Sequence, residues 1–262
     1  MALERLTLLE NAVDSLNEAL RKYNEGIDGD TKSYKFAITH FSHFIELMFK
    51  YYVSKSHPLL IYKNPYSKSL ETSRGRKDAT TIGLWEAVQF LKNEGKPIQE
   101  EFKQDMEWLK KLRNKIEHHE FKMDTREVRL TLGRLVRAFI DFNESHSTLN
   151  FDEKIDVMRY PAFVSLADEY KSRLENARAT ATEENDDDSN YNCPHCGATD
   201  TVSLSGDLFT CHLCDQTESA ITCRECSAII SETDAVDLDI DQHSPDPIYV
   251  CESCYDKMCY EE

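Results

Sequence analysis

The chain has 262 residues, of which 40% are hydrophobic and 30% are charged. This length and composition predict one sizeable core and a small second module. The chain contains no apolar run of about eighteen residues and no basic-then-apolar N-terminus, which excludes a membrane span and a signal peptide from the prediction. We therefore expect a cytoplasmic protein.

The C-terminal third differs from the rest of the chain in charge and in cysteine content. The formal net charge is −17, yet residues 181–262 hold 20 Asp and Glu against two Lys and Arg, which leaves residues 1–180 at about +1. All nine cysteines lie after residue 192. Such a regional concentration favours metal binding in a reducing compartment over disulfides.

The N-terminal residues predict two amphipathic helices. Over residues 2–24, apolar side chains recur at three- and four-residue steps, namely Leu6, Leu9, Val13, Leu16 and Leu20. Gly26 and Gly29 are expected to end this helix. A second helix is predicted over residues 32–54, and there Glu46 and Lys50 have the spacing of an ordinary i,i+4 pair.

Residues 58–78 are rich in turn-forming and basic residues, which predicts a long exposed loop. Its cations are Lys68, Arg74, Arg76 and Lys77. They either contact a phosphate backbone or form a solvated surface, and a loop of this length either guides a substrate or is mobile. Thr80 and Thr81 are expected to cap a short helix, which Gly95 and Pro97 separate from the next one.

The segment from about Pro97 to residue 121 predicts a helix with one buried stripe and a polar end. The stripe consists of Phe102, Met106, Leu109, Leu112 and Ile116. Asn114 and His118 are four residues apart and share a face, whereas Arg113 lies roughly 140° around the axis from His118. A compact site is easier to build if a second copy of the helix faces the first, so this spacing favours a two-fold dimer.

These residue types suit phosphodiester cleavage. An imidazole exchanges protons near neutral pH, and a guanidinium binds two phosphate oxygens at once. A purely structural interpretation is also open, in which an arginine forms a salt bridge and a histidine caps the end of the helix.

The string from Arg113 through Asn114 to His118 resembles the R-x4-6-H signature of HEPN domains. Residues 33–55 are similar to the second helix of many HEPN proteins, and residues 80–91 are similar to the segment before the motif helix. The resemblance spans roughly residues 5–145. It implies a dimeric helical bundle and, for catalytic members, a metal-independent endoribonuclease with a composite site across the dimer axis.

The resemblance also implies residue roles. His118 would act on the ribose 2′-hydroxyl or the leaving oxygen, Arg113 would stabilise the phosphate, and Asn114 would orient one of them. The product would carry a 2′,3′-cyclic phosphate. Glu46 is expected to hold Arg113, and His119 to be a neighbouring, supporting group. Similar domains cluster in bacterial toxin and anti-phage defence systems.

Two further helices and a linker are predicted after the motif. Asp124 and Glu127 suit a capped helix start, and the core stripe that follows is Val128, Leu132, Leu135, Phe139 and Phe142. Residues 152–178 predict another helix, interrupted near Pro161. Residues 181–192 are small, polar and acidic, which predicts a flexible linker.

Four CxxC pairs follow the linker: Cys193 with Cys196, Cys211 with Cys214, Cys223 with Cys226, and Cys251 with Cys254. Two such pairs supply the four thiolates of one structural zinc, so four pairs predict two zinc ions. The spacing resembles two successive zinc ribbons, with sequential pairing favoured over crossed pairing and redox dithiols as the alternative. His195 and Cys259 are expected not to be ligands.

The sequence thus predicts a mainly α protein: a HEPN-like helical domain over residues 1–150, an additional helix over 151–180, an acidic linker over 181–192, and a small β-rich module of tandem zinc ribbons over 193–262. The leading function is a homodimeric endoribonuclease that acts on RNA and needs no cofactor for catalysis. The alternative is a non-catalytic dimeric adaptor whose acidic ribbons recruit a protein partner.

Overall fold

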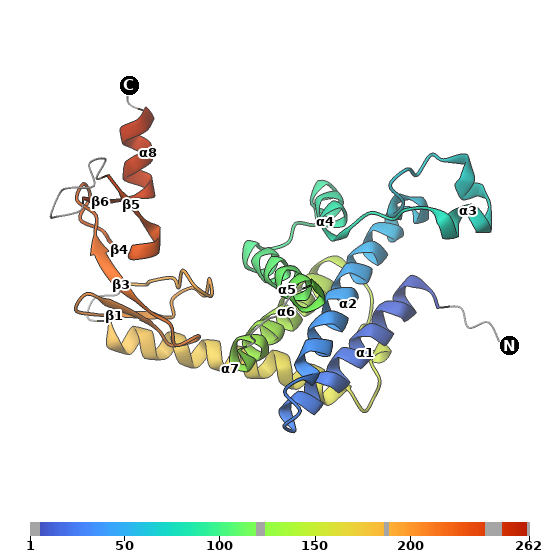
Figure 1. Ribbon diagram of the computed structural model, residues 1–262, viewed down its shortest axis with the longest axis horizontal. Helices are drawn as coiled ribbons and strands as arrows, with labels where there is room; N and C mark the ends of the chain where they lie inside the picture. Colours follow the sequence, from blue (N-terminus) through green and yellow to red (C-terminus); the bar gives the residue numbers. More distant parts are fainter. Residues whose placement is uncertain (1–5, 119–123, 186–188, 239–247, 261–262) are drawn as a thin grey trace. The chain divides into compact units, whose positions relative to one another are not determined.

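The computed structural model describes residues 6–118, 124–185, 189–238 and 248–260 (Figure 1). The chain divides into two compact units, a helical unit over Met1–Tyr170 and a metal-ligand unit over Lys171–Glu262. Within the described ranges, every helix is too short or too polar to cross a membrane.

The helical unit is built mainly from long amphipathic helices. Its helices are α1 (Leu8–Ile27), α2 (Ser33–Ser56), α3 (Ser73–Asp78), α4 (Leu84–Asn93), α5 (Glu100–His118), α6 (Thr125–His146) and the beginning of α7 (Tyr160–Glu184). The 3-10 turns are η1 (Pro58–Ile61), η2 (Lys68–Glu71) and η3 (Asp152–Lys154). The mainly helical prediction is confirmed for this part of the chain.

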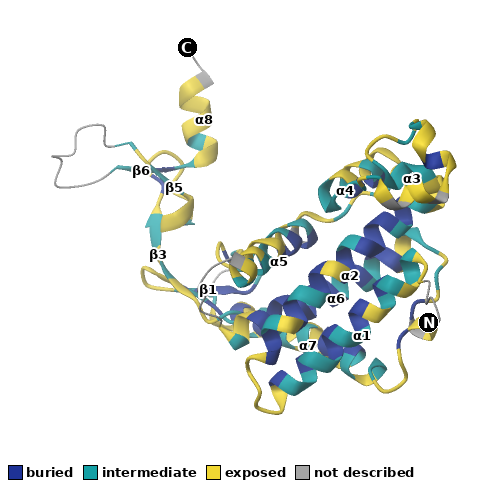
Figure 2. Cartoon of the chain, turned by 45° about the vertical axis from the view of Figure 1, so that its right-hand side comes forward, coloured by how far each residue is buried: buried dark blue, intermediate teal, exposed yellow. Residues whose placement is uncertain are grey.

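The core of the helical unit is the set of apolar stripes that periodicity predicts. Figure 2 shows the buried residues concentrated along the inner sides of α1, α2 and α6. Aromatic rings fill the centre, where Phe44 of α2 packs edge-on against Phe139 of α6 with ring centroids 4.9 Å apart, and Phe151 contacts both rings. Edge-to-face packing suits the quadrupoles of these rings.

Local capping chemistry fixes several helix ends. The Asp124 side chain accepts hydrogen bonds from the backbone N–H groups of Arg126 and Glu127, as predicted for the start of α6. The prediction that Thr80 and Thr81 cap α4 is wrong. That helix begins later, at Leu84, because the Glu86 side chain accepts the Gly83 N–H at 2.7 Å, while Thr81 forms a β-bridge with Tyr62.

The expected long loop over residues 58–78 is exposed but has more structure than predicted. It contains η1, η2 and the short helix α3. Leu70 is buried at its centre, and the Thr72 hydroxyl accepts the Gly75 N–H at the start of α3. One buried apolar residue and one cap therefore order a segment that composition alone classifies as a loop.

The predicted flexible linker is wrong in its first residues, because α7 continues through Glu184. Pro161 lies in the first turn of this helix, a position that proline tolerates, and does not interrupt it. Beyond the helix, the Asn185 side chain donates to the backbone oxygen of Val202 and accepts the N–H of Leu204. These contacts hold residues 181–185 in place; residues 186–188 lie outside the described ranges.

The metal-ligand unit combines the C-terminal half of α7 with small antiparallel sheets. A four-stranded sheet has the order β1 (Val202–Ser205), β2 (Leu208–Cys211), β3 (Thr217–Thr222) and β4 (Ile229–Ser231); a two-stranded sheet pairs β5 (Ala235–Asp237) with β6 (Tyr249–Cys251) and precedes α8 (Glu252–Tyr260). Arg178 of α7 donates to the backbone oxygen and to the hydroxyl of Thr199. The folded unit therefore includes helical residues that precede the predicted boundary at residue 193.

Candidate functional site

The motif helix α5 is anchored to the core along one side. Phe102, Met106 and Leu109 are buried, and Leu112 and Ile116 pack against the core as partly buried residues. The predicted stripe is therefore confirmed. The opposite side of α5 faces solvent, which leaves its polar residues accessible.

A buried ion pair also fixes α5. Asp105 is fully buried, and the Arg134 guanidinium of α6 donates to both of its carboxylate oxygens, with an Nε–Oδ2 distance of 2.6 Å. A bidentate pair of this kind sets the rotation of one helix against the other. Together with the apolar stripe, it holds the polar residues of α5 on the outer side.

Arg113 lies on the outer side of α5. Its Nε donates to Glu117 Oε1 at 2.9 Å, one turn further along the same helix, and 36% of its side chain is exposed. Asn114 is also exposed. His118 is the last residue of α5, but its side chain and the whole of His119 lie outside the described part of the chain. The predicted approach of His118 to Arg113 and Asn114 therefore stays a prediction.

Glu46 of α2 binds Lys50. The Lys50 ammonium is nearly buried and donates to Glu46 Oε1 at 2.7 Å and to Thr81 Oγ1 at 3.1 Å. This is the i,i+4 pair that the sequence predicts. Support of Arg113 by Glu46 stays a prediction, because the ion pairs of the described residues join Glu46 to Lys50 and Arg113 to Glu117.

His43 of α2 was not among the predicted site residues. Its Nδ1 lies 2.9 Å from the hydroxyl of Ser15, a buried residue of α1. Loss of water around the ring lowers the pKa of His43, the charge of Glu46 opposes this, and the charge of Arg113 lowers it further. His43 and Arg113 are therefore electrostatic neighbours on α2 and α5. The sequence places His43 off the apolar stripe, but no local signal indicates which helix it faces.

A polar cleft adjoins His43. It has a volume of about 600 Å³, and its lining includes His40 and His43 of α2, Asp14 and Glu18 of α1, and Arg159. Acidic and basic groups are mixed along its walls. The cleft therefore favours no single charge of ligand.

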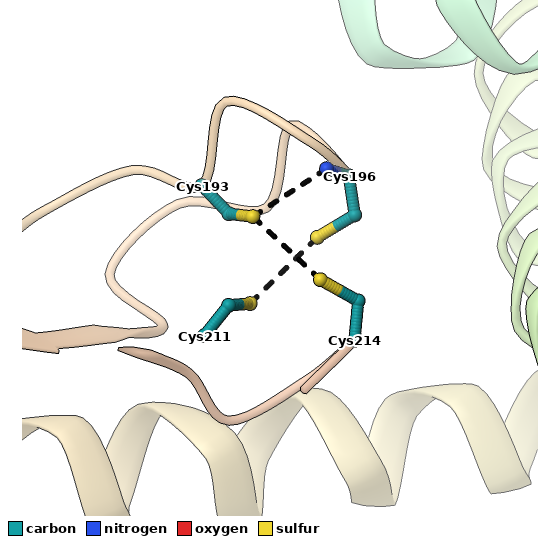
Figure 3. Close-up of side chains that lie close together, drawn as sticks. All are labelled: Cys193, Cys196, Cys211 and Cys214. Carbon is teal, nitrogen blue, oxygen red and sulfur yellow. Dashed lines mark hydrogen bonds between the residues drawn. The ribbon is translucent and has the colours of Figure 1, made fainter. Parts of the chain in front are cut away.

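Four cysteine sulfurs converge at each of two centres in the metal-ligand unit. Cys193, Cys196, Cys211 and Cys214 form the first centre, and Cys223, Cys226, Cys251 and Cys254 form the second; within each, all sulfurs lie within 4.8 Å of one another. Figure 3 shows the side chains of the first centre pointing toward a common point. Sequential pairing of the CxxC motifs is thereby confirmed.

The sulfur spacing fits a tetrahedral ion. The Cys193–Cys214 and Cys196–Cys211 sulfurs are 3.7 and 3.8 Å apart, and the Cys226–Cys251 sulfurs are 3.8 Å apart. A zinc–sulfur bond of about 2.3 Å in tetrahedral geometry places the sulfurs about 3.8 Å from one another. Both groups can therefore hold a metal ion of this size.

Backbone geometry shapes three of the four CxxC turns in the same way. In each, the backbone oxygen of the first cysteine accepts a hydrogen bond from the N–H of the residue four positions later, namely Gly197, Asp215 or Ser227. Each of these residues has a positive φ, between 57° and 70°. The resulting tight turn directs both sulfurs of a pair to the same side. The fourth pair differs: Cys251 ends β6, as Cys211 ends β2, but Cys254 lies in the first turn of α8.

The second centre is therefore not a simple repeat of the first. In the first, one pair lies in a turn before β1 and the other in a turn that begins at Cys211, the last residue of β2, whereas the second draws its last ligand from a helix. Backbone N–H groups of Cys226 and Cys251 lower the pKa of the Cys223 thiol to about 6, which favours the thiolate that a metal needs. Neither His195 nor Cys259 belongs to a described ligand group; the His195 Nε2 lies 3.4 Å from Glu218 Oε2.

Comparison of the chain with protein-family models, with curated proteins and with solved structures gives no match. A function for this chain therefore has to be inferred from the site geometry and from the motif resemblance.

Proposed function

We propose that the helical unit is a metal-independent endoribonuclease that acts as a homodimer, with Arg113, Asn114 and His118 as its catalytic residues. The observation that carries this proposal is the position of Arg113. Its guanidinium stands outside the core, and the described contact with Glu117 engages Nε and leaves the two terminal nitrogens for an anion. A phosphate bound to these two nitrogens would receive a two-pronged, charge-assisted contact.

In the proposed reaction, His118 removes the proton from the ribose 2′-hydroxyl. The 2′-oxygen then attacks phosphorus, and the 5′-oxygen leaves with a proton from the partner's His118. The product is a 2′,3′-cyclic phosphate and a free 5′-hydroxyl. Arg113 stabilises the charge that grows on the phosphate oxygens, and Asn114 orients the phosphate. By the same motif resemblance, we propose a bacterial toxin or anti-phage defence role.

The experiment is cleavage of labelled total cellular RNA by the purified full chain in a chelator of divalent cations. Arg113→Ala and His118→Ala should each slow cleavage by at least about 100-fold, because each removes a group used in the transition state. The cleaved ends should carry a cyclic phosphate.

The chain offers matched control variants for this experiment. Arg137 pairs with Asp141 on α6 at the same i,i+4 spacing and with 39% of its side chain exposed, and His146 ends α6 as His118 ends α5. Arg137→Ala and His146→Ala should cleave within about twofold of the unmodified chain. Equal rates in the Arg113 and Arg137 variants, or cleavage that requires added magnesium, would refute the proposal.

A second candidate function is that of a dimeric adaptor without catalytic activity. It is favoured by the surface of the metal-ligand unit, where Leu208, Ile229, Tyr255 and Met258 are exposed large apolar residues on a strongly acidic chain segment. Exposed apolar groups among like charges suit a protein partner and disfavour nucleic acid. The full chain would then form dimers, bind a protein through this unit and leave RNA intact.

We infer that each tetra-Cys group holds one zinc ion with a structural role. Four thiolates close the coordination sphere, so no position remains for a substrate or a reactive water. The inference is supported by the tetrahedral sulfur spacing and by the backbone N–H groups directed at the Cys223 sulfur.

A further inference from the structure

Residues 63–80 form an arm that is closed at its base. The backbones of Tyr62 and Thr81 form an antiparallel bridge, the Lys63 N–H donates to the Thr80 oxygen at 3.0 Å, and the Ile82 N–H donates to the Ile61 oxygen at 2.8 Å. The arm lies beyond the end of α2, and Figure 2 shows it as largely exposed around α3. A closed base means that the arm leaves and rejoins the helical unit at one place.

The arm is internally ordered. Its two short helices, η2 and α3, approach so closely at Gly75 that a Cβ there would lie 1.8 Å from the backbone oxygen of Ser69. Leu70 of η2 is buried. The arm therefore presents its side chains from a defined backbone.

The arm is basic although the helical unit as a whole is near neutral. Residues 63–80 contain five Lys and Arg against two Asp and Glu. Lys63, Lys68, Arg74 and Arg76 are all exposed. Lys63 lies 3.8 Å from Glu86, whereas no acidic group of the described residues forms an ion pair with the other three. Their charge is available to an anionic partner.

Tyr66 lies between Lys63 and Lys68 in the sequence, and 93% of its surface is exposed. It occupies the third position of a turn that the Ser67 N–H closes on the Asn64 oxygen at 3.2 Å, directly after Pro65, so its backbone is already restricted. An exposure this high means that the ring contributes almost nothing to packing of the described residues. Proteins combine exposed aromatic rings with lysines and arginines to stack unpaired bases and hold the adjoining phosphates, and the arm carries both kinds of side chain.

We propose that the arm binds single-stranded RNA, with Tyr66 stacked on a base and Lys68, Arg74 and Arg76 contacting the phosphates. This proposal rests on the endoribonuclease proposal only for the choice of RNA. An anionic membrane is disfavoured, because Tyr66 is the sole large apolar side chain exposed in the described part of the arm, and insertion into lipid needs several.

The test is fluorescence anisotropy of a labelled 20-nucleotide oligouridine titrated with the full chain carrying His118→Ala, so that the probe stays intact. Tyr66→Ala should weaken binding about tenfold through loss of one base stack, whereas Tyr66→Phe keeps the ring and should stay within about twofold. The logarithm of the binding constant falls linearly with the logarithm of the salt concentration, and each phosphate contact contributes about 0.7 to the slope. Replacing Lys68, Arg74 and Arg76 together by Ala should therefore reduce the size of this slope by about 2.

Phe36 supplies the matched control. It is an exposed aromatic residue on α2, 45% accessible, with the ammonium groups of Lys22 and Lys35 at 5.6 and 5.1 Å from its ring centroid. The Phe36→Ala variant should bind the probe as tightly as the chain that carries only His118→Ala. Equal losses in the Phe36 and Tyr66 variants, no loss in Tyr66→Ala, or tighter binding to phosphatidylglycerol vesicles than to the probe would each overturn the proposal.

The two proposals fail in different ways. Binding that depends on Tyr66 in a chain that never cleaves RNA would remove the nuclease and keep the arm. Cleavage that depends on Arg113 together with binding insensitive to Tyr66 would keep the nuclease and remove the arm.

Discussion

The carboxylate of Asp105, a residue of α5, is completely buried. Its full desolvation is offset by two hydrogen bonds from Arg134, which is itself 14% exposed in its side chain. Such a pair contributes little net stability compared with an apolar one, but removal of one partner leaves the other charge buried and uncompensated. The pair therefore acts mainly as a positional constraint between α5 and α6.

Asp105→Asn should lower the free energy of unfolding of the helical unit by about 3–5 kcal/mol, because the largely buried Arg134 guanidinium loses the negative charge of Asp105. Urea unfolding followed by tryptophan fluorescence measures this, since both tryptophans, Trp85 and Trp108, lie in the helical unit. Asp141→Asn removes the exposed partner of Arg137 and should cost at most about 0.5 kcal/mol. Similar losses in the two variants would contradict the assigned role of the buried pair.

Helix α6 is held against α7 by close backbone approach. A Cβ added at Gly133 would lie 2.8 Å from the backbone oxygen of Leu166 and 3.0 Å from the Cβ of Tyr170. Glycine in the middle of a helix ordinarily weakens it, so the absence of a side chain here has a packing reason. The contact fixes the spacing of the two helices within the helical unit.

Gly133→Ala should destabilise the helical unit by about 1–3 kcal/mol, because backbone must move to admit the methyl group and the gain in helix propensity is smaller than that. Thermal unfolding followed by tryptophan fluorescence measures the change. A variant as stable as the unmodified chain, or more stable, would show that α6 and α7 separate at little cost.

At the scale of the whole molecule, the chain combines two units that are stabilised by different chemistry. The helical unit has a large apolar core, whereas the metal-ligand unit has short strands and eight cysteines gathered into two centres. A sheet of this size buries too little apolar surface to be stable unaided, so metal binding is expected to provide much of its folding free energy.

Elemental analysis of the purified full chain should give two zinc ions per chain. Cys211→Ser should remove one, Cys254→Ser should remove the other, and Cys259→Ser, which changes a cysteine outside both centres, should retain two. Tryptophan-detected unfolding should be unaffected in all three variants. A zinc content that falls in the Cys259 variant, or that stays at two in the others, would refute the assignment of ligands.

The sequence predicts those features of the candidate site that depend on residues within one or two helical turns. Arg113 and Asn114 lie on the outer side of α5, as the spacing of its apolar residues requires, and Glu46 and Lys50 pair across one helical turn. The neighbourhood of His43 and Arg113 could not be predicted, because these residues are 70 positions apart and depend on how α2 packs on α5. The side chain of His118 lies outside the described part of the chain, so its role stays a prediction.

The sequence by itself determined what close neighbours along the chain decide: the helical stripes, the Asp124 cap and the presence of four CxxC pairs. It favoured sequential pairing of these motifs, and the structure decided it. Only the tertiary structure decided how far α7 extends and what fixes α5. Arg178 and Asn185 find partners about twenty positions away at Thr199, Val202 and Leu204, and Asp105 finds Arg134 one helix later. Periodicity and capping are encoded within one or two helical turns, whereas a polar side chain that bonds to a distant residue leaves no local pattern.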